Sequence, residues 1–117
     1  MARPLIMLVL TLGLAACGGE GSGRTTVLQL AADPEGALAF DHDALQAPEG
    51  AVTIELTNDA PIPHDISVEG NGVRESSPTA IGSRTSLEVE LDPGKYTFYC
   101  SVANHREAGM EGTLTVE

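Results

Sequence analysis

The chain has 117 residues, with 17 acidic residues against six basic ones and a formal net charge of −11 at pH 7. This length suits one small domain. The acidic residues are spread along the chain, and such a surface argues against nucleic acid or anionic lipid as a direct partner. The charge either serves solubility alone or steers the protein toward a partner with a basic patch.

The first 16 residues have the pattern of a secretory signal peptide. Arg3 gives a positive start, and residues 5–16 are mostly apolar but too few to span a bilayer. The stretch ends in Leu14-Ala-Ala-Cys17-Gly, which resembles the bacterial lipoprotein signal. This resemblance implies cleavage before Cys17, lipidation of Cys17, and an exported chain held on the outer side of the cytoplasmic membrane or in the periplasm. An ordinary signal peptide cut nearby would leave Cys17 free.

Residues 17–24 continue with a Gly-rich run that predicts a flexible tether, and the folded domain is predicted over residues 25–117. Cys17 and Cys100 are the two cysteines of the chain. Two cysteines in an exported protein normally form a disulfide, but a lipidated Cys17 leaves Cys100 without a partner. A metal bond would explain this lone thiol, because coordination deprotonates and protects the sulfur.

Alternating apolar and polar residues predict β-strands along most of the domain. Weak patterns occur near Leu28–Leu30 and Leu38–Phe40, and the clearer ones cover residues 52–57, 65–69, 87–91, 95–99 and 113–117. Turn residues separate several of these strands. About seven to eight short strands with one apolar face predict an all-β, Greek-key antiparallel β-sandwich, with a β-barrel as the alternative. Residues 73–84 have the weakest pattern and are predicted to be largely loop.

A short loop near the C-terminus carries three side chains that bind soft metals. Cys100, His105 and Met110 form a Cys-x4-His-x4-Met run, and a second imidazole is available upstream at His64. Two histidines and one cysteine in a trigonal set, with a weak methionine above, are the ligands of a blue-copper electron-transfer site. Each residue alone would be explained as an ordinary core residue, so it is the combination that indicates copper.

The strand period supports these candidates, because side chains two residues apart point to the same face of a strand. Cys100 and His64 fall on the apolar faces of their strands, and so does Met110 if its strand is regular that far back. His64 reaches the same end of the domain as Cys100 if the two strands run antiparallel. His105 lies in the connecting loop, where the strand period predicts nothing.

Other sites fit the sequence less well. Zinc binds Cys and His, but methionine is a poor zinc ligand. A binuclear copper centre needs two bridging cysteines, and the loop has one. His42, between two aspartates, is expected to be a solvated turn residue. No catalytic pairing stands out, and the methionine near Cys100 favours coordination over attack on a substrate, so we expect no small-molecule substrate and no enzyme.

The segments 94–100 and 109–115, together with residues 47–50 and 52–58, resemble the cupredoxins, the small blue-copper proteins. The resemblance is greatest to plastocyanin/azurin-like domains with a loop of the auracyanin type, and it covers roughly residues 25–117. It implies one type 1 copper per chain, bound by His64, Cys100, His105 and Met110. It also implies that the ring edge of His105 reaches the surface as the electron port, within a small apolar collar formed by Ile62, Pro63, Ala103, Ala108 and Gly109.

The sequence departs from this family at Asp65, where many cupredoxins have asparagine after the first histidine ligand. The resemblance implies that residue 65 ties the two ligand segments together, and an aspartate can do so by accepting a bond from the region of Ser101. It cannot donate as an amide does. Its negative charge, when ionised, favours Cu(II) and lowers the reduction potential.

Together these features predict an exported, membrane-anchored blue-copper protein that shuttles single electrons between redox protein partners. A copper-binding carrier that delivers the metal within the cell envelope is the alternative, and it would exchange copper rapidly with chelators. A metal-free sandwich that serves as an adhesion module would take up no stoichiometric copper.

Overall fold

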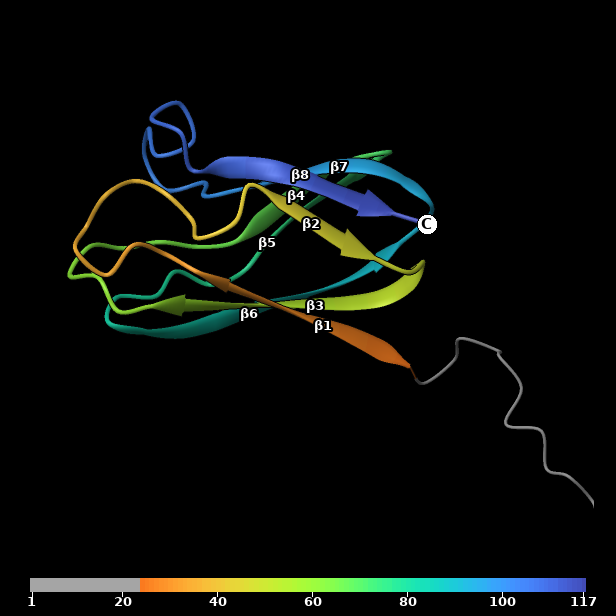
Figure 1. Ribbon diagram of the computed structural model, residues 1–117, viewed down its shortest axis with the longest axis horizontal. Helices are drawn as coiled ribbons and strands as arrows, with labels where there is room; N and C mark the ends of the chain where they lie inside the picture. The colour runs from red at the N-terminus through yellow and green to blue at the C-terminus, as the bar shows by residue number, and fades with distance from the viewer. Residues whose placement is uncertain (1–23) are drawn as a thin grey trace, which may run out of the picture.

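The computed structural model describes residues 24–117, so the predicted signal peptide, Cys17 and most of the predicted tether lie outside the described residues. Eight strands form two sheets (Figure 1). The described residues contain no helix long and apolar enough to cross a membrane. In chain order the strands are β1 (Thr25–Ala31), β2 (Ala44–Ala47), β3 (Gly50–Asn58), β4 (Ser67–Gly70), β5 (Val73–Ser76), β6 (Ser83–Leu91), β7 (Gly94–Tyr99) and β8 (Glu111–Val116).

The strands are ordered β1-β3-β6 in the smaller sheet and β2-β8-β7-β4-β5 in the larger one. Two stacked sheets confirm the predicted all-β sandwich and its number of strands. The sheets are mixed rather than purely antiparallel, because β1 pairs with β3 and β2 pairs with β8 in parallel. Side-chain alternation is the same in parallel and antiparallel strands, so the sequence pattern could not distinguish the two.

The hydrophobic core lies between the two sheets, where the inward residues of each strand meet. Its centre contains Ile54 and Leu56 from the smaller sheet and Val68, Phe98 and Leu114 from the larger one, all fully buried. Burying a side chain of this size contributes about 1.5–3 kcal/mol. The core therefore supplies a rigid support for the loops at its ends.

Three predicted boundaries differ from the structure. The second strand is Ala44–Ala47, and Phe40 makes only an isolated bridge to Ala32. Residues 73–84 contain β5 and the first residues of β6, although this segment was predicted to be largely loop. His64 precedes its strand, because β4 begins at Ser67 and His64 instead forms a bridge with Ala80.

The long loops gather at one end of the sandwich, at the left of Figure 1. These loops follow β1, β3, β5 and β7, and they include residues 59–66 and 100–110. The short turns before β3, β5 and β7 lie at the opposite end, where β1 also begins. All four predicted ligands are therefore near one end of the domain, and the described chain begins at the other.

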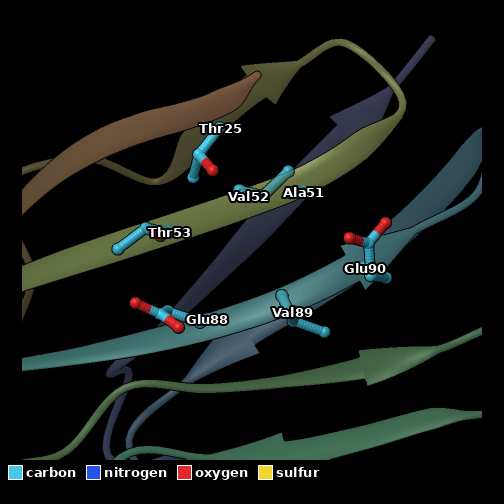
Figure 2. A pocket seen from close by; sticks show the side chains of 7 residues that line it. All are labelled: Thr25, Ala51, Val52, Thr53, Glu88, Val89 and Glu90. Atoms are coloured by element: carbon cyan, nitrogen blue, oxygen red, sulfur yellow. The ribbon is translucent and has the colours of Figure 1, made fainter. Parts of the chain in front are cut away.

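A hollow on the smaller sheet lies away from the predicted ligands. It is formed over the first residues of β1 and β3 and the last residues of β6, and it contains two carboxylates but no His or Cys (Figure 2). The hollow is therefore separate from the metal chemistry predicted above. Its lining residues are Thr25, Ala51, Val52, Thr53, Glu88, Val89 and Glu90.

Candidate metal centre

The loop between β7 and β8 is closed by its own backbone hydrogen bonds. The amide of Cys100 donates to the carbonyl of Met110 at 3.1 Å, and the amide of Met110 donates to the carbonyl of His105 at 3.1 Å. The amide of His105 in turn donates to the carbonyl of Val102 at 3.0 Å. The three predicted ligands of this loop are thus linked to one another through the main chain.

His64 is held by the loop that follows β5. Its amide and carbonyl exchange hydrogen bonds with Ala80 at 3.0 and 2.9 Å. The buried side-chain amide of Asn58 donates through Nδ2 to the backbone carbonyls of Ile62 and Ala80, each at 2.8 Å. Because β4 runs antiparallel to β7, this arrangement places His64 at the same end of the sandwich as Cys100, as the sequence predicted.

Three potential metal-binding atoms face one another at this end. The Nδ1 atoms of His64 and His105 are 3.2 Å apart, and the Cys100 Sγ lies 3.8 Å from the first and 3.6 Å from the second. A point equidistant from the corners of such a triangle is about 2 Å from each of them, which is the range of metal–nitrogen and metal–sulfur bonds in proteins. The residues present therefore fit a trigonal site for a first-row metal.

Met110 completes the group that the sequence predicted. Its side chain is fully buried and belongs to the same apolar cluster as Cys100. A thioether is uncharged and can be placed in such surroundings without a hydrogen-bond partner. Among the described residues, His64, Cys100 and His105 form the cluster of His, Cys and carboxylate groups that could hold an ion, and Met110 adds a soft sulfur donor to it.

Burial acts in opposite ways on two of these groups: it favours the metal-binding form of His64 but keeps the Cys100 thiol protonated until a metal binds. It lowers the pKa of His64, and the neighbouring His105 lowers that pKa further, so the imidazole stays neutral. Burial also raises the pKa of the Cys100 thiol. A metal must displace this proton, and a neutral imidazole with a free Nδ1 lone pair is the form that binds metals. The His64 Nε2 then carries the proton, and it has no hydrogen-bond partner among residues 24–117.

Asp65 connects the two ligand-bearing segments. It is 4% exposed, and its carboxylate accepts hydrogen bonds from the Ser101 amide at 2.7 Å and from the Ser101 hydroxyl. The Ser67 hydroxyl also donates to it, at 3.4 Å. The hydrogen bond from the Ser101 region to Asp65, which the sequence predicted, is therefore present. These partners all donate to Asp65, as suits an ionised carboxylate.

The surface near the cluster includes the residues expected to form a collar. Ala103, Ala108 and Gly109 are exposed, whereas Ile62, Pro63 and His105 are partly buried. Ile81, which the sequence did not single out, is 59% exposed and follows Ala80, the bridge partner of His64. His42 lies outside the cluster, where it pairs with Asp41 at 2.9 Å on the surface, as expected for a turn residue.

The sequence pattern did not predict the role of several residues that support the site. Asn58 and Ser77 are buried polar residues that bond to the backbone around His64, and Ser77 does so by accepting from the Ile66 amide at 3.0 Å. Arg106 makes two ion pairs, to Glu69 and to Glu111. A polar residue at the end of a strand, as Asn58 is at the end of β3, is the signal that could have indicated it, but nothing local to the sequence reveals the partners of Arg106.

Comparisons with known proteins agree with this geometry. Residues 27–117 match the model of the family of copper-binding proteins described as plastocyanin/azurin. The chain is 32% identical to plastocyanin of Prochlorothrix hollandica, over 99% of this chain and 92% of that protein.

Solved auracyanins share the fold. Auracyanin B superposes with a TM-score of 0.69 at 22% identity, covering 79% of this chain and 88% of that one. Auracyanin A of Chloroflexus aurantiacus, a blue copper protein, gives 0.69 at 18% identity, covering 80% of this chain and all of that one. The reduced auracyanin of Roseiflexus castenholzii superposes with a TM-score of 0.66 at 21% identity, covering 81% of this chain and 99% of that one.

The family match extends over residues 27–117, nearly all of the described domain, and includes the loop that carries Cys100, His105 and Met110. The chain therefore belongs to the plastocyanin/azurin family of copper-binding proteins: it is a blue-copper electron carrier rather than an enzyme, and its type 1 copper site consists of His64, Cys100, His105 and Met110.

Proposed function

We propose that the protein is exported and shuttles single electrons between redox proteins while a lipid on Cys17 holds it at a membrane. The observation that carries the electron-transfer role is the triangle of His64 Nδ1, His105 Nδ1 and Cys100 Sγ, with edges of 3.2–3.8 Å. In this proposal these three atoms are the equatorial ligands, and the thioether of Met110 is the weak axial one.

Bound copper supplies the one-electron redox chemistry, and the chain supplies a site that changes little between oxidation states. The loop bonds among Cys100, His105 and Met110 fix three ligands, and the Ala80 bridge fixes His64. Ligands held by buried strands and backbone bonds keep their positions when the charge on the metal changes. Because the geometry of the site changes little between the two oxidation states, electron transfer is fast in either direction.

His105 is the proposed point of electron entry and exit. Its side chain is partly buried, whereas His64 is fully buried. The exposed Ala103, Ala108 and Gly109 give a partner a small apolar surface on the same loop. An apolar contact of this kind allows close approach without a large cost of removing water from charged groups.

The proposed protein partners carry basic docking patches. The loops at the ligand end include the exposed acidic residues Glu35, Asp59 and Glu107. Acidic groups around a small apolar contact steer a basic partner toward that end and accelerate encounter at low salt. The direct partner is therefore a protein rather than nucleic acid or an anionic lipid surface.

The position of β1 supports anchoring through Cys17. The described chain begins at Arg24, at the end of the sandwich opposite to the ligands (Figure 1). The seven residues after Cys17 reach about 25 Å at most, which is less than the length of about 30 Å expected for the nine-residue strand β3. A lipid on Cys17 would therefore leave the ligand end directed away from the membrane and open to partners.

Cyclic voltammetry of the copper-loaded full chain, together with copper exchange into a chelator, tests the shuttle. We expect a reversible one-electron wave and copper loss that is slow relative to electron transfer. Rapid loss of copper to the chelator, without a reversible wave, would contradict the shuttle and favour a carrier that delivers copper.

Expression of the full chain in a bacterium tests the anchor separately. We expect the protein in the membrane fraction, with an N-terminal Cys17 whose mass includes acyl chains, and we expect Cys17→Ser to release it. Cys100→Ser, which removes the other thiol, serves as the control and should leave the protein membrane-bound. A wild-type protein that is soluble outside the cytoplasm would contradict the anchor but leave the copper site untouched.

A further inference from the structure

Arg106, which follows the ligand His105, contacts three strands of the larger sheet. Its Nη2 donates to Glu69 Oε1 at 2.5 Å, and its Nε donates to Glu111 Oε2 at 3.1 Å. Its guanidinium carbon lies 4.2 Å from the centre of the Tyr99 ring. One side chain from the ligand loop thus contacts β4, β7 and β8 at the same time.

Arg106 and two of its three contact residues are next to a copper ligand in the chain. Arg106 follows His105, Tyr99 precedes Cys100, and Glu111 follows Met110. Glu69 lies on β4, the strand that continues from the His64 segment. A single guanidinium group therefore joins both ends of the loop from Cys100 to Met110 to the strand that follows the His64 segment.

These contacts lie on the side of the sheet that faces away from the copper ligands. Neighbouring residues of a strand point to opposite faces, so on β7 Tyr99 points away from the core residue Phe98, and Glu69 on β4 likewise points away from the core residue Val68. Tyr99 and Glu111 are register partners on β7 and β8. Arg106 therefore closes the ligand loop over the outer face of the sheet while the ligands point inward.

The chemistry of arginine suits this position. Its planar fork can hold two carboxylates while its face stacks on an aromatic ring, which a lysine ammonium cannot do. The hydrogen bond from Arg106 lowers the pKa of Glu69 below its ordinary value, so the carboxylate remains charged. The arginine is one-third exposed, so its effect rests on holding several groups together rather than on one strong pair.

We propose that Arg106 is a positioning residue that fixes the geometry of the copper ligands through Glu69, Tyr99 and Glu111. This inference rests on the ligand assignment of the proposed function. Without the contacts of Arg106, the loop from Cys100 to Met110 keeps its backbone bonds but loses its tie to the outer face of the sheet. The ligands then move more between the two oxidation states, and the copper leaves more easily.

The test compares variants of the copper-loaded full chain. Arg106→Met removes the guanidinium but keeps an apolar stem, and Arg106→Lys keeps the charge without the fork. We expect both to accelerate copper loss to excess chelator about tenfold, at the lower end of what residues supporting metal ligands contribute. We also expect both to slow electron self-exchange, measured by NMR line broadening, by about the same factor, and to alter the copper EPR parameters.

Arg84→Met is the matched control, because exposed Arg84 on β6 loses the same charge without any ion pair to residues 24–117. Its copper loss and self-exchange should stay within about twofold of wild type. The proposal is overturned if Arg106→Met leaves the rates of copper loss and self-exchange unchanged. It is equally overturned if Arg106→Lys has both rates at the wild-type level, since charge alone would then account for the effect. It is also overturned if Arg106→Met lowers only the melting temperatures of the apo and copper forms.

The wild-type spectrum separates this inference from the copper site itself. A wild-type protein without a blue copper band would overturn the ligand assignment, and with it this role of Arg106. Wild-type protein that is blue, together with Arg106 variants that behave like wild type, would overturn the role of Arg106 alone.

Discussion

Asp65 and Ser101 join the two halves of the copper site across a partly buried contact. The Ser101 amide and hydroxyl both donate to the Asp65 carboxylate, the amide at 2.7 Å. Asp65 follows the ligand His64, and Ser101 follows the ligand Cys100. The pair therefore holds two ligands in register and places a negative charge beside the metal.

Asp65→Asn should raise the reduction potential of the copper. The amide oxygen can still accept from the Ser101 amide, but the negative charge that favours Cu(II) is lost. Coulomb's law gives the size of the effect. A unit charge a few ångströms from the copper, at an effective dielectric constant of about 20, shifts the reduction potential by on the order of tens of millivolts or more. Voltammetry at low and high salt measures this shift, and a potential that falls would contradict the role assigned to the charge.

Asp65→Ala should act differently, because it removes the acceptor as well as the charge. The Ser101 amide and hydroxyl would lose their acceptor at a partly buried position, at a cost of about 1 kcal/mol. We expect a lower urea midpoint for the apo protein, whereas Asp65→Asn should stay close to wild type. Equal stabilities of the two variants would show that the contact does not support the fold.

Met110→Leu should keep the blue colour but change its spectrum and raise the potential. Leucine conserves volume, so the fully buried position should tolerate it at a cost below about 1.5 kcal/mol. The loss of a sulfur donor leaves the site more apolar, which disfavours the more highly charged Cu(II) state. An unchanged spectrum and potential would refute the axial role of Met110 and leave the other three ligands as they are.

The stability of the apo protein should fall toward both acid and alkaline pH. The pKa of His64 is lowered from 6.5, so the unfolded chain takes up that proton first, and stability is lost as the pH falls below about 6.5 toward the lowered value. The pKa of Cys100 is raised from 9.0, so stability is lost as the pH rises through and above that value. Urea unfolding at about pH 5, 7 and 10 measures both limbs.

Copper loading provides the control for this pH dependence. A bound metal holds the thiolate and the imidazole in their deprotonated forms, so neither titrates while it stays bound. The copper form should therefore vary less with pH between these values than the apo form. An apo protein whose urea midpoint is the same at pH 5 and 7 would contradict the effect assigned to His64.

Gly112→Ala should destabilise the domain. Gly112 pairs with Phe98 across β7 and β8, and a Cβ at this position would collide with the Phe98 ring and the Asp43 carbonyl. Overpacking of a filled core costs about 1–3 kcal/mol. Thermal unfolding of the apo protein measures the loss, and a melting temperature equal to that of wild type would show that β8 can move away from Phe98.

The strands and the cysteine loop could be predicted from the sequence because they depend on local patterns. The alternation over β3, β6, β7 and β8 follows from a single apolar face, and the spacing of Cys100, His105 and Met110 lies in one short loop. The position of β2 could not be predicted, because its four residues gain their stability from parallel pairing with β8 rather than from their own pattern.

The strand period correctly predicted that His64 points inward, but the alternation of the strand is not what places it there. Residues 64–68 are all buried, so both faces of this segment lie inside the protein and alternation does not distinguish them. The position of His64 depends instead on its bridge to Ala80 and on Asn58, which come from distant parts of the chain. Such tertiary contacts, like those of Arg106, leave no local signal in a single sequence.

Titration of the full chain with Cu(II), followed by visible absorption, tests the central claim most directly. We predict an intense thiolate-to-copper charge-transfer band that saturates at one copper per chain and is absent in Cys100→Ser. A protein that stays colourless and takes up no stoichiometric copper, or a band that persists in Cys100→Ser, would contradict the assignment of His64, Cys100, His105 and Met110 as a blue-copper site.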